Sequence, residues 1–227
     1  MNTVNVSRRR LLQASAVTGG GLVLGFAFTG FSNTPEPLPV ANTKEAWTPN
    51  AFIQVLPDNT IRFYTARSEM GQGVTTGLAT LVGEELDVNP FDMDIRLAGV
   101  HEDYVNPLFG MQGTGGSTSI RAHYTQLRQA GANTRALILE AAARDLGVAA
   151  SSLATDNGYV VAGEARPPYS EFIATAQSLT IEADAPLKAA AEFRFIGRES
   201  RRVDAIAKAT GTAQFGIDVD IPGLHFA

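Results

Sequence analysis

The sequence predicts an α+β fold, a unit of short strands and two to three helices. Short alternating apolar stretches are followed by two stretches with the 3.6-residue apolar period of a helix. A glycine-rich loop stands directly before each helical stretch: the first glycine loop, residues 69–73 (EMGQG), and the second, residues 113–119 (GTGGSTS). The order strand, strand, helix, strand, helix, hairpin, helix is typical of an α+β unit.

Residues 1–32 are predicted to be a targeting segment outside the fold. Arg8, Arg9 and Arg10 precede an uncharged stretch, residues 14–31, that is rich in Gly and Ala. This pattern is typical of an export signal, and the twin arginine indicates the twin-arginine route to the periplasm. The stretch is borderline for the about 20 residues that span a membrane, and no A-x-A cleavage site is evident. A cleaved signal and an N-terminal anchor in the inner membrane both remain open.

The next elements are predicted to be short strands. Residues 33–50 carry four prolines and little periodicity, which indicates a linker or an extended arm. Alternating apolar residues predict strands over 51–56 and 60–66, joined by a Pro-Asp-Asn turn. Another short strand is predicted over 93–97.

Two amphipathic helices are predicted to follow the glycine loops. Apolar residues recur at helical spacing from Val74 to Leu86 and again from Ile120 to Ala141. Gly147 is expected to end the second helix, because glycine readily adopts the left-handed conformation that terminates helices.

Shorter elements are expected in the rest of the chain. Residues 99–113 form a long irregular connection, and connections of this length are often functional. Residues 155–161 are typical of a hairpin around an Asp-Asn-Gly turn. Ser170 is expected to cap a last helix that ends near Gln177.

The composition limits what the protein can bind. Its 227 residues, 44% of them hydrophobic, suffice for one or two domains. Without the three arginines of the targeting segment, 15 basic residues face 23 acidic ones, a net charge of −8. Such a body is a poor general nucleic-acid binder. There are no cysteines, so iron–sulfur clusters held by cysteine are excluded from this chain, and any redox electrons must leave through another one.

The two glycine loops together predict a binding site for a large anionic cofactor. Glycine lets backbone approach a ligand closely, and a helix start offers free N–H groups and the positive end of the helix dipole. In the second loop, serine and threonine hydroxyls at residues 117–119 add the chemistry of a phosphate or pyrophosphate cradle. Each loop taken alone is also explained as an ordinary turn or a Ser/Thr helix cap.

Familiar nucleotide and hydrolase motifs are absent from the sequence. It contains no GxxxxGK[ST] P-loop and no GxSxG nucleophile elbow, and the second glycine loop does not match GxGxxG. Known phosphate-binding signatures therefore do not account for the loops.

Single side chains near the loops carry further expectations. Gln72, flanked by glycines, could contact a polar ring or an oxo group, with turn surface as the alternative. Glu69 could act as a base, but hydrogen bonding to backbone is the favoured interpretation. Arg121, Arg128 and Arg135 are seven residues apart and share one helix face, which is interpreted as solvated. The alternatives are contact of Arg121 with a cofactor phosphate and contact of this face with a partner subunit.

In this order and spacing, the two loops and the helices behind them resemble the molybdenum-binding subunit of the xanthine dehydrogenase/aldehyde oxidase family. The isoquinoline 1-oxidoreductase beta-subunit type, which includes periplasmic aldehyde dehydrogenases, is the most similar branch. The resemblance runs from about residue 51 to the C-terminus. Part of it is a tail that resembles the opening of the family's hammerhead domain: Arg202-Val203-Asp204, Lys208, Thr210-Gly211, Ala213, Phe215, Asp218 and Pro222-Gly223-Leu224.

The resemblance implies a molybdenum cofactor, molybdopterin cytosine dinucleotide in bacterial members. It assigns the cofactor contacts to both loops: Gly71, Gln72, Gly73, Gly115, Gly116, Ser117, Thr118 and Ser119. Gly116 would lie near the molybdenum, and no residue of this chain would bind the metal directly. The implied reaction hydroxylates an aldehyde or an electron-poor heteroaromatic with water-derived oxygen. Electrons would pass to an iron–sulfur small subunit and onward to a cytochrome acceptor.

One family feature is missing from the chain. The family's catalytic glutamate lies in a Gly-x-Gly-Glu motif, which this sequence lacks, as it lacks the second pterin-binding region. We therefore expect no catalytic residue here and no activity from the chain alone. It is expected to be the N-terminal part of a longer or split subunit. The alternatives are an inactive remnant or assembly module, and an exported binding module for another phosphorylated ligand.

These expectations divide the chain into five parts. They are a signal or anchor (1–32), a linker (33–50), a molybdopterin-binding-like α+β domain (51–182), a spacer (183–200) and the truncated start of a hammerhead-like domain (201–227).

Overall fold

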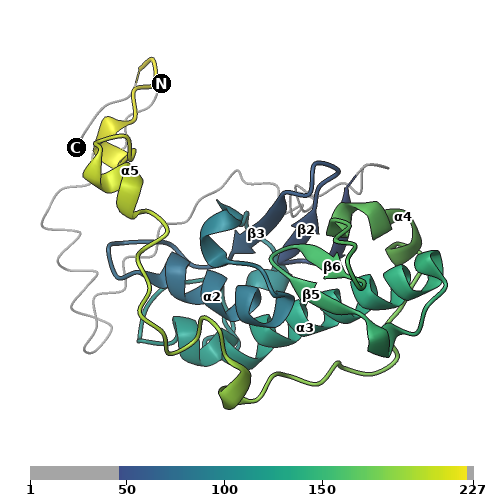
Figure 1. The fold of residues 1–227 in the computed structure, drawn as a ribbon. Coiled ribbons are helices and arrows are strands. Elements are labelled where there is room, and N and C mark those ends of the chain that lie inside the picture. Colours follow the sequence, from purple (N-terminus) through teal and green to yellow (C-terminus); the bar gives the residue numbers. More distant parts are fainter. Residues whose placement is uncertain (1–45, 224–227) are drawn as a thin grey trace, which may run out of the picture. The chain divides into compact units, whose positions relative to one another are not determined.

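The computed structural model describes residues 46–223. The predicted targeting segment and most of the predicted linker lie outside the described residues. Within residues 46–223, no helix is both long and apolar enough to cross a membrane. The fold is α+β, as the sequence predicts (Figure 1).

A four-stranded sheet forms one layer. Its strands are β1 (Trp47–Asn50), β2 (Ile53–Val55), β3 (Ile61–Thr65) and β4 (Asp94–Leu97), in the order β1-β2-β3-β4. β1 and β3 pair antiparallel with β2, whereas β3 and β4 are parallel. The predicted strands are confirmed. β1 lies where a linker was predicted, because its proline obscured the strand pattern, and proline is tolerated in edge strands such as this one.

Helix α2 (Val74–Leu86) connects the two parallel strands, as parallel pairing requires a crossover. It begins after Gly73 (φ 82°) and ends before Asp87 (φ 55°), both left-handed. The apolar positions that predicted this helix are all buried: Val74, Leu78, Leu81, Val82 and Leu86.

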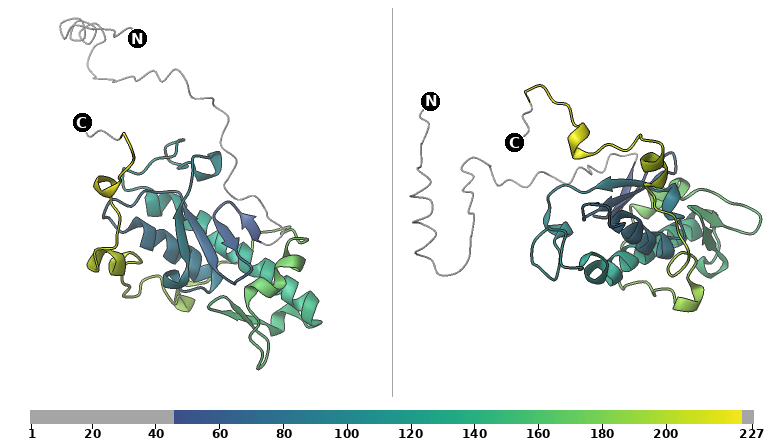
Figure 2. Two further views of the ribbon diagram at one scale, coloured as in Figure 1. Left: turned by 90° about the horizontal axis from the view of Figure 1, so that it is seen from above. Right: turned by 90° about the vertical axis from the view of Figure 1, so that its left-hand side faces the viewer.

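Helix α3 (Ser119–Leu146) packs closely beside α2 on one face of the sheet (Figure 2). A glycine makes the close approach possible, because a Cβ at Gly131 would lie 2.7 Å from the carbonyl oxygen of Val82. Leu127 and Ile138 point into the core between the helices and the sheet. Gly147, at φ 67°, ends the helix as predicted.

The remaining elements are short. The predicted hairpin is confirmed as β5 (Ala154–Asp156) and β6 (Tyr159–Val161). α4 (Ile173–Ala176) and α5 (Ala205–Ala209) are each a turn or so long. Six 3-10 turns complete the described part: Pro90–Asp92, Glu102–Tyr104, Ala150–Ser152, Tyr169–Phe172, Ala190–Glu192 and Gly216–Asp218.

The predicted capping role of Ser170 is wrong. Ser170 lies inside the 3-10 turn Tyr169–Phe172 that precedes α4, and the residue before this turn is Pro168. The backbone N–H of Ser170 donates to Oδ1 of Asn59, at 3.1 Å. A long-range contact with the β2–β3 turn, rather than a local cap, therefore positions this segment.

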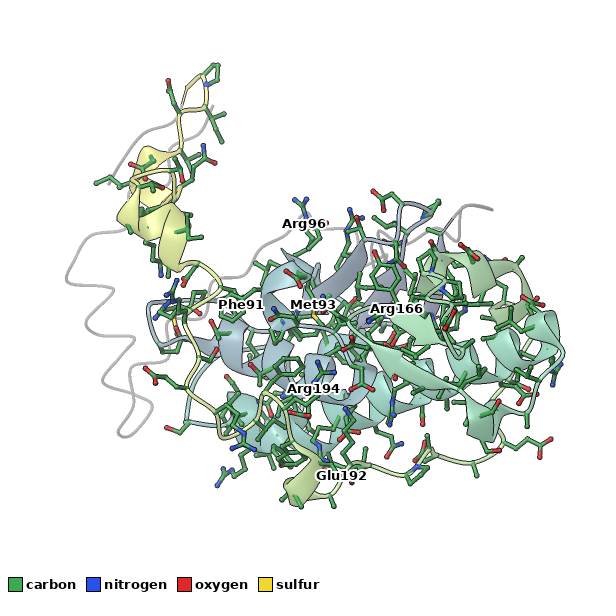
Figure 3. All side chains as sticks on the ribbon, in the orientation of Figure 1. Phe91, Met93, Arg96, Arg166, Glu192 and Arg194 are labelled. Atoms are coloured by element: carbon green, nitrogen blue, oxygen red, sulfur yellow. The ribbon has the colours of Figure 1, made fainter. Side chains whose placement is uncertain are left out.

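The predicted spacer is bound to α2 along much of its length; we call residues 183–200 the return segment. The carboxylate of Glu84, which has no exposed surface, accepts hydrogen bonds from the backbone N–H groups of Arg194, Phe195 and Ile196 at 2.8–2.9 Å. Figure 3 labels Arg194 on this segment, which crosses α2 and α3. A buried carboxylate holds the return segment by its backbone, so the alanine-rich sequence there gave no sign of the contact.

Candidate functional site

The two glycine loops lie side by side at the starts of α2 and α3. They are joined directly, because the backbone N–H of Ser68 donates to Oγ1 of Thr114 at 2.9 Å. Gly71 and Gly73 in the first loop and Gly116 in the second have positive φ values of 98°, 82° and 59°. The structure thus brings together the two stretches that the sequence selected.

The start of α3 offers hydrogen-bond donors to a ligand. Thr118, the N-cap residue, makes no side-chain capping bond. In residues 46–223, no group accepts a hydrogen bond from the backbone N–H of Ser119, Ile120 or Arg121. The helix has 28 residues, so the positive end of its dipole adds to these donors. This start is suited to an anion.

Thr118 supports this loop from inside. Its buried hydroxyl donates to the carbonyl of Gly115 at 2.9 Å and accepts from Nδ2 of Asn106 at 2.7 Å. Both interactions are internal, so Thr118 holds the loop in place and does not present its hydroxyl outward. Gly115, Gly116 and Ser117 are exposed, and Ser119 is half-buried.

Phe109 lies against the second loop from the long connection. A Cβ at Gly116 would lie 2.9 Å from Cζ of Phe109, and the φ of Gly116 is left-handed. The left-handed φ favours glycine at position 116, and any larger residue there would also have to displace the exposed end of Phe109. The Phe109 ring is 47% exposed beside this glycine.

A buried arginine lies beneath the start of α3. Arg67 follows β3 and has no exposed surface. Its guanidinium donates to the carbonyls of Ala66 and Tyr104, at 2.9 and 3.2 Å, and to Nε2 of His123 at 2.8 Å. All three partners are neutral, and Nε has none within residues 46–223. A buried cation without a carboxylate partner is costly, so Arg67 adds positive charge beneath the start of α3 at the expense of stability.

His123 completes this pair from the first turn of α3. Its Nδ1 lies 3.0 Å from the carbonyl oxygen of Ser119, so Nδ1–H donates and Nε2 accepts from Arg67. Burial, and next the charge of Arg67, lower the pKa of His123 below its ordinary value, although the Ser119 carbonyl opposes this shift. The imidazole is therefore held neutral.

The first loop is different, because its own glutamate occupies the helix start. The Glu69 carboxylate accepts from the backbone N–H groups of Gly71, Gly73 and Thr75 at 2.9, 2.9 and 3.1 Å. The favoured interpretation of Glu69 is confirmed, and its carboxylate takes the Thr75 N–H, one of the donors that the start of α2 was predicted to offer. Burial alone would raise the pKa of Glu69, but these N–H donors and Arg202 together hold that pKa below its usual range.

Gln72 is exposed, and its amide is folded onto its own loop. Oε1 accepts from the backbone N–H of Met70 at 2.5 Å, and Nε2 donates to the carbonyl of Ser68 at 2.9 Å. One amide hydrogen and one lone pair of this side chain remain for a ligand.

The three arginines of α3 do not share a solvated face. Arg128 is buried and binds Glu85 through Nε at 2.8 Å. Arg135 lies 3.6 Å from Asp87, and only Arg121 is exposed. The solvated-face prediction is wrong for Arg128 because α2 presents a carboxylate at that position.

Sequence reasoning missed the residues that support the loops from below. Arg67 and Asn106 carry no motif, and their importance depends on burial and on partners distant in the sequence. The adjacent glutamates 84 and 85 were a usable signal, because two acidic residues on the apolar face of a helix need partners.

Comparisons with known proteins show the family of the chain. Residues 2–221 match the family described as molybdopterin cofactor-binding domain. The chain is 33% identical over 229 residues to the membrane-bound aldehyde dehydrogenase (pyrroloquinoline-quinone) of Gluconacetobacter polyoxogenes, covering 98% of this chain and 29% of that protein. It is 29% identical over 262 residues to the beta subunit of isoquinoline 1-oxidoreductase of Brevundimonas diminuta, covering 99% and 33%.

A third relative, the B subunit of nicotinate dehydrogenase of Pseudomonas putida, is 32% identical over 176 residues, covering 76% of this chain and 14% of that protein. The chain thus spans a third or less of the length of these curated relatives. The match to the family covers nearly all of the chain and includes both glycine loops, and the chain belongs to the molybdopterin cofactor-binding domain family.

Proposed function

We propose that this chain is the N-terminal part of an exported molybdenum hydroxylase subunit, in which the second glycine loop forms one wall of the cofactor site. The single observation that carries this proposal is the start of α3, where free N–H donors lie above the buried, carboxylate-free guanidinium of Arg67. Family membership supports molybdopterin as the anion that binds there.

The residues present fit such a group. The N–H groups of Ser119, Ile120 and Arg121 and the exposed Ser117 would hold phosphate oxygens, and Arg67 would supply buried positive charge. Gly116 would allow close approach, while Phe109 beside it would exclude water. Bound molybdenum would supply oxygen transfer and two-electron chemistry. The residues of this chain bind and orient, since Glu69 is engaged with backbone and His123 is buried against Arg67.

The finer parts of the proposal rest on the resemblance and on the relatives' names. The cofactor is molybdopterin cytosine dinucleotide, and the substrate is an aldehyde or an N-heteroaromatic. Two relatives are named as the beta or B subunits of oxidoreductases, which supports further subunits as partners. On the resemblance alone, the partner is an iron–sulfur small subunit and the acceptor a cytochrome. The protein is exported to the periplasm by the twin-arginine route, and residues 201–227 begin a hammerhead-like domain.

The test is the metal content of the complete, matured protein. Gly116→Ala should leave about a tenth or less of the wild-type molybdenum, because its methyl group would occupy the surface that the cofactor is proposed to approach and would push the end of Phe109 aside. Gly163→Ala is the matched control, since Gly163 has a similar φ of 62° and nothing within 4 Å of its Cβ. Elemental analysis and fluorescence of the released pterin measure the outcome.

Two results would contradict the proposal. Wild-type protein that holds no molybdenum after correct maturation would remove the cofactor assignment, and pyrroloquinoline quinone in its place would support the cofactor in one relative's name. Equal molybdenum in the two glycine variants would show that the second loop is not a wall of the site.

A catalytically inactive assembly module is the alternative, favoured by the lack of a Gly-x-Gly-Glu motif in the sequence. In that case the complete protein should fold and associate with its partner subunit, and no pterin should be released on denaturation.

A further inference from the structure

Arg202 contacts the first glycine loop from a distant part of the chain. Its Nη1 donates to the carbonyl of Gly71 at 2.7 Å, and its Nη2 donates to Oε1 of Glu69 at 3.0 Å. A Cβ added at Gly73 would lie 3.7 Å from Nη1, so the space beside this glycine is also taken by the guanidinium. One side chain therefore bonds two of the five loop residues, Glu69 and Gly71.

The guanidinium is held in this orientation by its own segment. Asp204 accepts from Nε and Nη2 of Arg202, both at 2.8 Å, the bidentate geometry that fixes an arginine plane. Lys208 lies 2.6 Å from the same carboxylate. A further bond joins the segment to α2, from the backbone N–H of Val203 to Oγ1 of Thr76 at 3.1 Å.

We infer that Arg202 is a positioning residue for the first glycine loop, acting through Glu69 and the Gly71 carbonyl. Glu69 closes the loop by accepting hydrogen bonds from three backbone N–H groups. Arg202 binds both this carboxylate and the carbonyl of Gly71. Docking of residues 201–204 and the conformation of residues 69–75 are therefore coupled.

Charge gives the contact a second effect. A carboxylate at the mouth of an anion site would repel the ligand, but Arg202 and Lys208 balance Glu69 and Asp204 within this cluster. Arg202 thus makes a glutamate-closed loop compatible with a neighbouring anion. This second effect rests on the proposed function, whereas the positioning role does not.

The test measures amide hydrogen exchange of the full chain without cofactor. Arg202→Ala should raise exchange at Gly71, Gly73 and Thr75 at least tenfold, because the Glu69 carboxylate loses its second anchor. Arg202→Lys should raise it at least threefold, because one ammonium group cannot bind Gly71, Glu69 and Asp204 in the same geometry. Arg201→Ala, at an exposed neighbour, should match the wild type.

Asp204→Asn keeps Arg202 but weakens the bidentate ion pair that orients its guanidinium. It therefore serves as a second variant if Arg202→Ala fails to fold. It should also raise exchange at least twofold in the loop and leave the amides of Arg194, Phe195 and Ile196 protected. If Arg202→Lys showed the same amide exchange as the wild type, the inference that the forked guanidinium positions the loop would be wrong. Equal increases in the loop and at residues 194–196 would show general opening and overturn the positioning role. Because no cofactor is needed, failure here is distinct from failure of the proposed function.

Discussion

Arg67 and His123 show how single residues set the electrostatics of the site. Arg67 is fully buried and has only neutral partners, and His123 accepts its hydrogen bond in the neutral state. A charge buried in this way costs stability, and in the proposed function its purpose is to attract the anionic ligand at the start of α3.

His123 should make the stability of the protein depend on pH. Because its folded pKa lies below the unfolded value of about 6.5, the unfolded state binds the proton first as pH falls. The free energy of unfolding therefore has its full value above about pH 6.5. It decreases below that pH, by at most about 1.4 kcal/mol per pH unit for one proton. His123→Gln should remove this slope in urea unfolding measured from pH 5 to 8. His101→Gln, in the exposed connection, should keep it; equal slopes in both variants would contradict the assignment.

At the scale of elements, the packing of α2 against α3 depends on where glycine lies. Gly131 faces backbone, the Val82 carbonyl, whereas Gly77 faces the end of the Ile120 side chain. Backbone cannot yield without moving a helix, while a 41% exposed isoleucine can rotate away. A larger residue is therefore excluded at position 131 but can be accommodated at position 77.

Substitution of these glycines should separate the two cases. Gly131→Ala should destabilise the chain by about 1–3 kcal/mol, the usual result of overpacking. Gly77→Ala should stay within about 1 kcal/mol of the wild type or exceed it, because alanine is the better helix former by about 1 kcal/mol. Equilibrium unfolding in urea measures both, and a larger loss for Gly77→Ala would refute the packing argument.

At the scale of the whole molecule, buried carboxylates of α2 hold the return segment. Glu84 binds three consecutive backbone N–H groups, and Glu85 binds Arg128 and the backbone N–H of Lys188. The return segment in turn leads to Arg202 and the first glycine loop. Glu84, near the carboxyl end of α2, thereby holds the return segment, and the residues that follow this segment bring Arg202 to the first glycine loop at the amino end of α2.

Glu84→Ala should free the return segment. It leaves three N–H groups without their acceptor, a loss on the order of 3 kcal/mol, and limited proteolysis should then cut within residues 183–200 first. Glu182→Ala removes an exposed glutamate beside the same segment and should leave cleavage unchanged. Cleavage at the same rate in both variants would show that Glu84 does not anchor the segment.

Periodicity and turn chemistry allowed much of the fold to be predicted from the sequence. α2, α3 and the β5–β6 hairpin follow from local patterns, and so does the stop at Gly147. β1 was missed because its proline obscured the strand pattern, and the cap at Ser170 was wrong because Asn59, far away in the sequence, binds that backbone. Of the candidate site, both glycine loops were found, but Arg67 and Asn106 were not, since burial gives them their role.

The sequence by itself determined the two long helices, most strands, the two loops and the resemblance that family membership confirms. Only the tertiary structure decided what holds each helix start. At α2, the carboxylate of Glu69 takes the Thr75 N–H, and Arg202, 133 positions away from Glu69, holds that carboxylate in place, whereas the donors at the start of α3 have no partner in residues 46–223. The physical reason is that a carboxylate bound at a helix start takes the place of an incoming anion, and the cation that anchors it can come from any part of the chain.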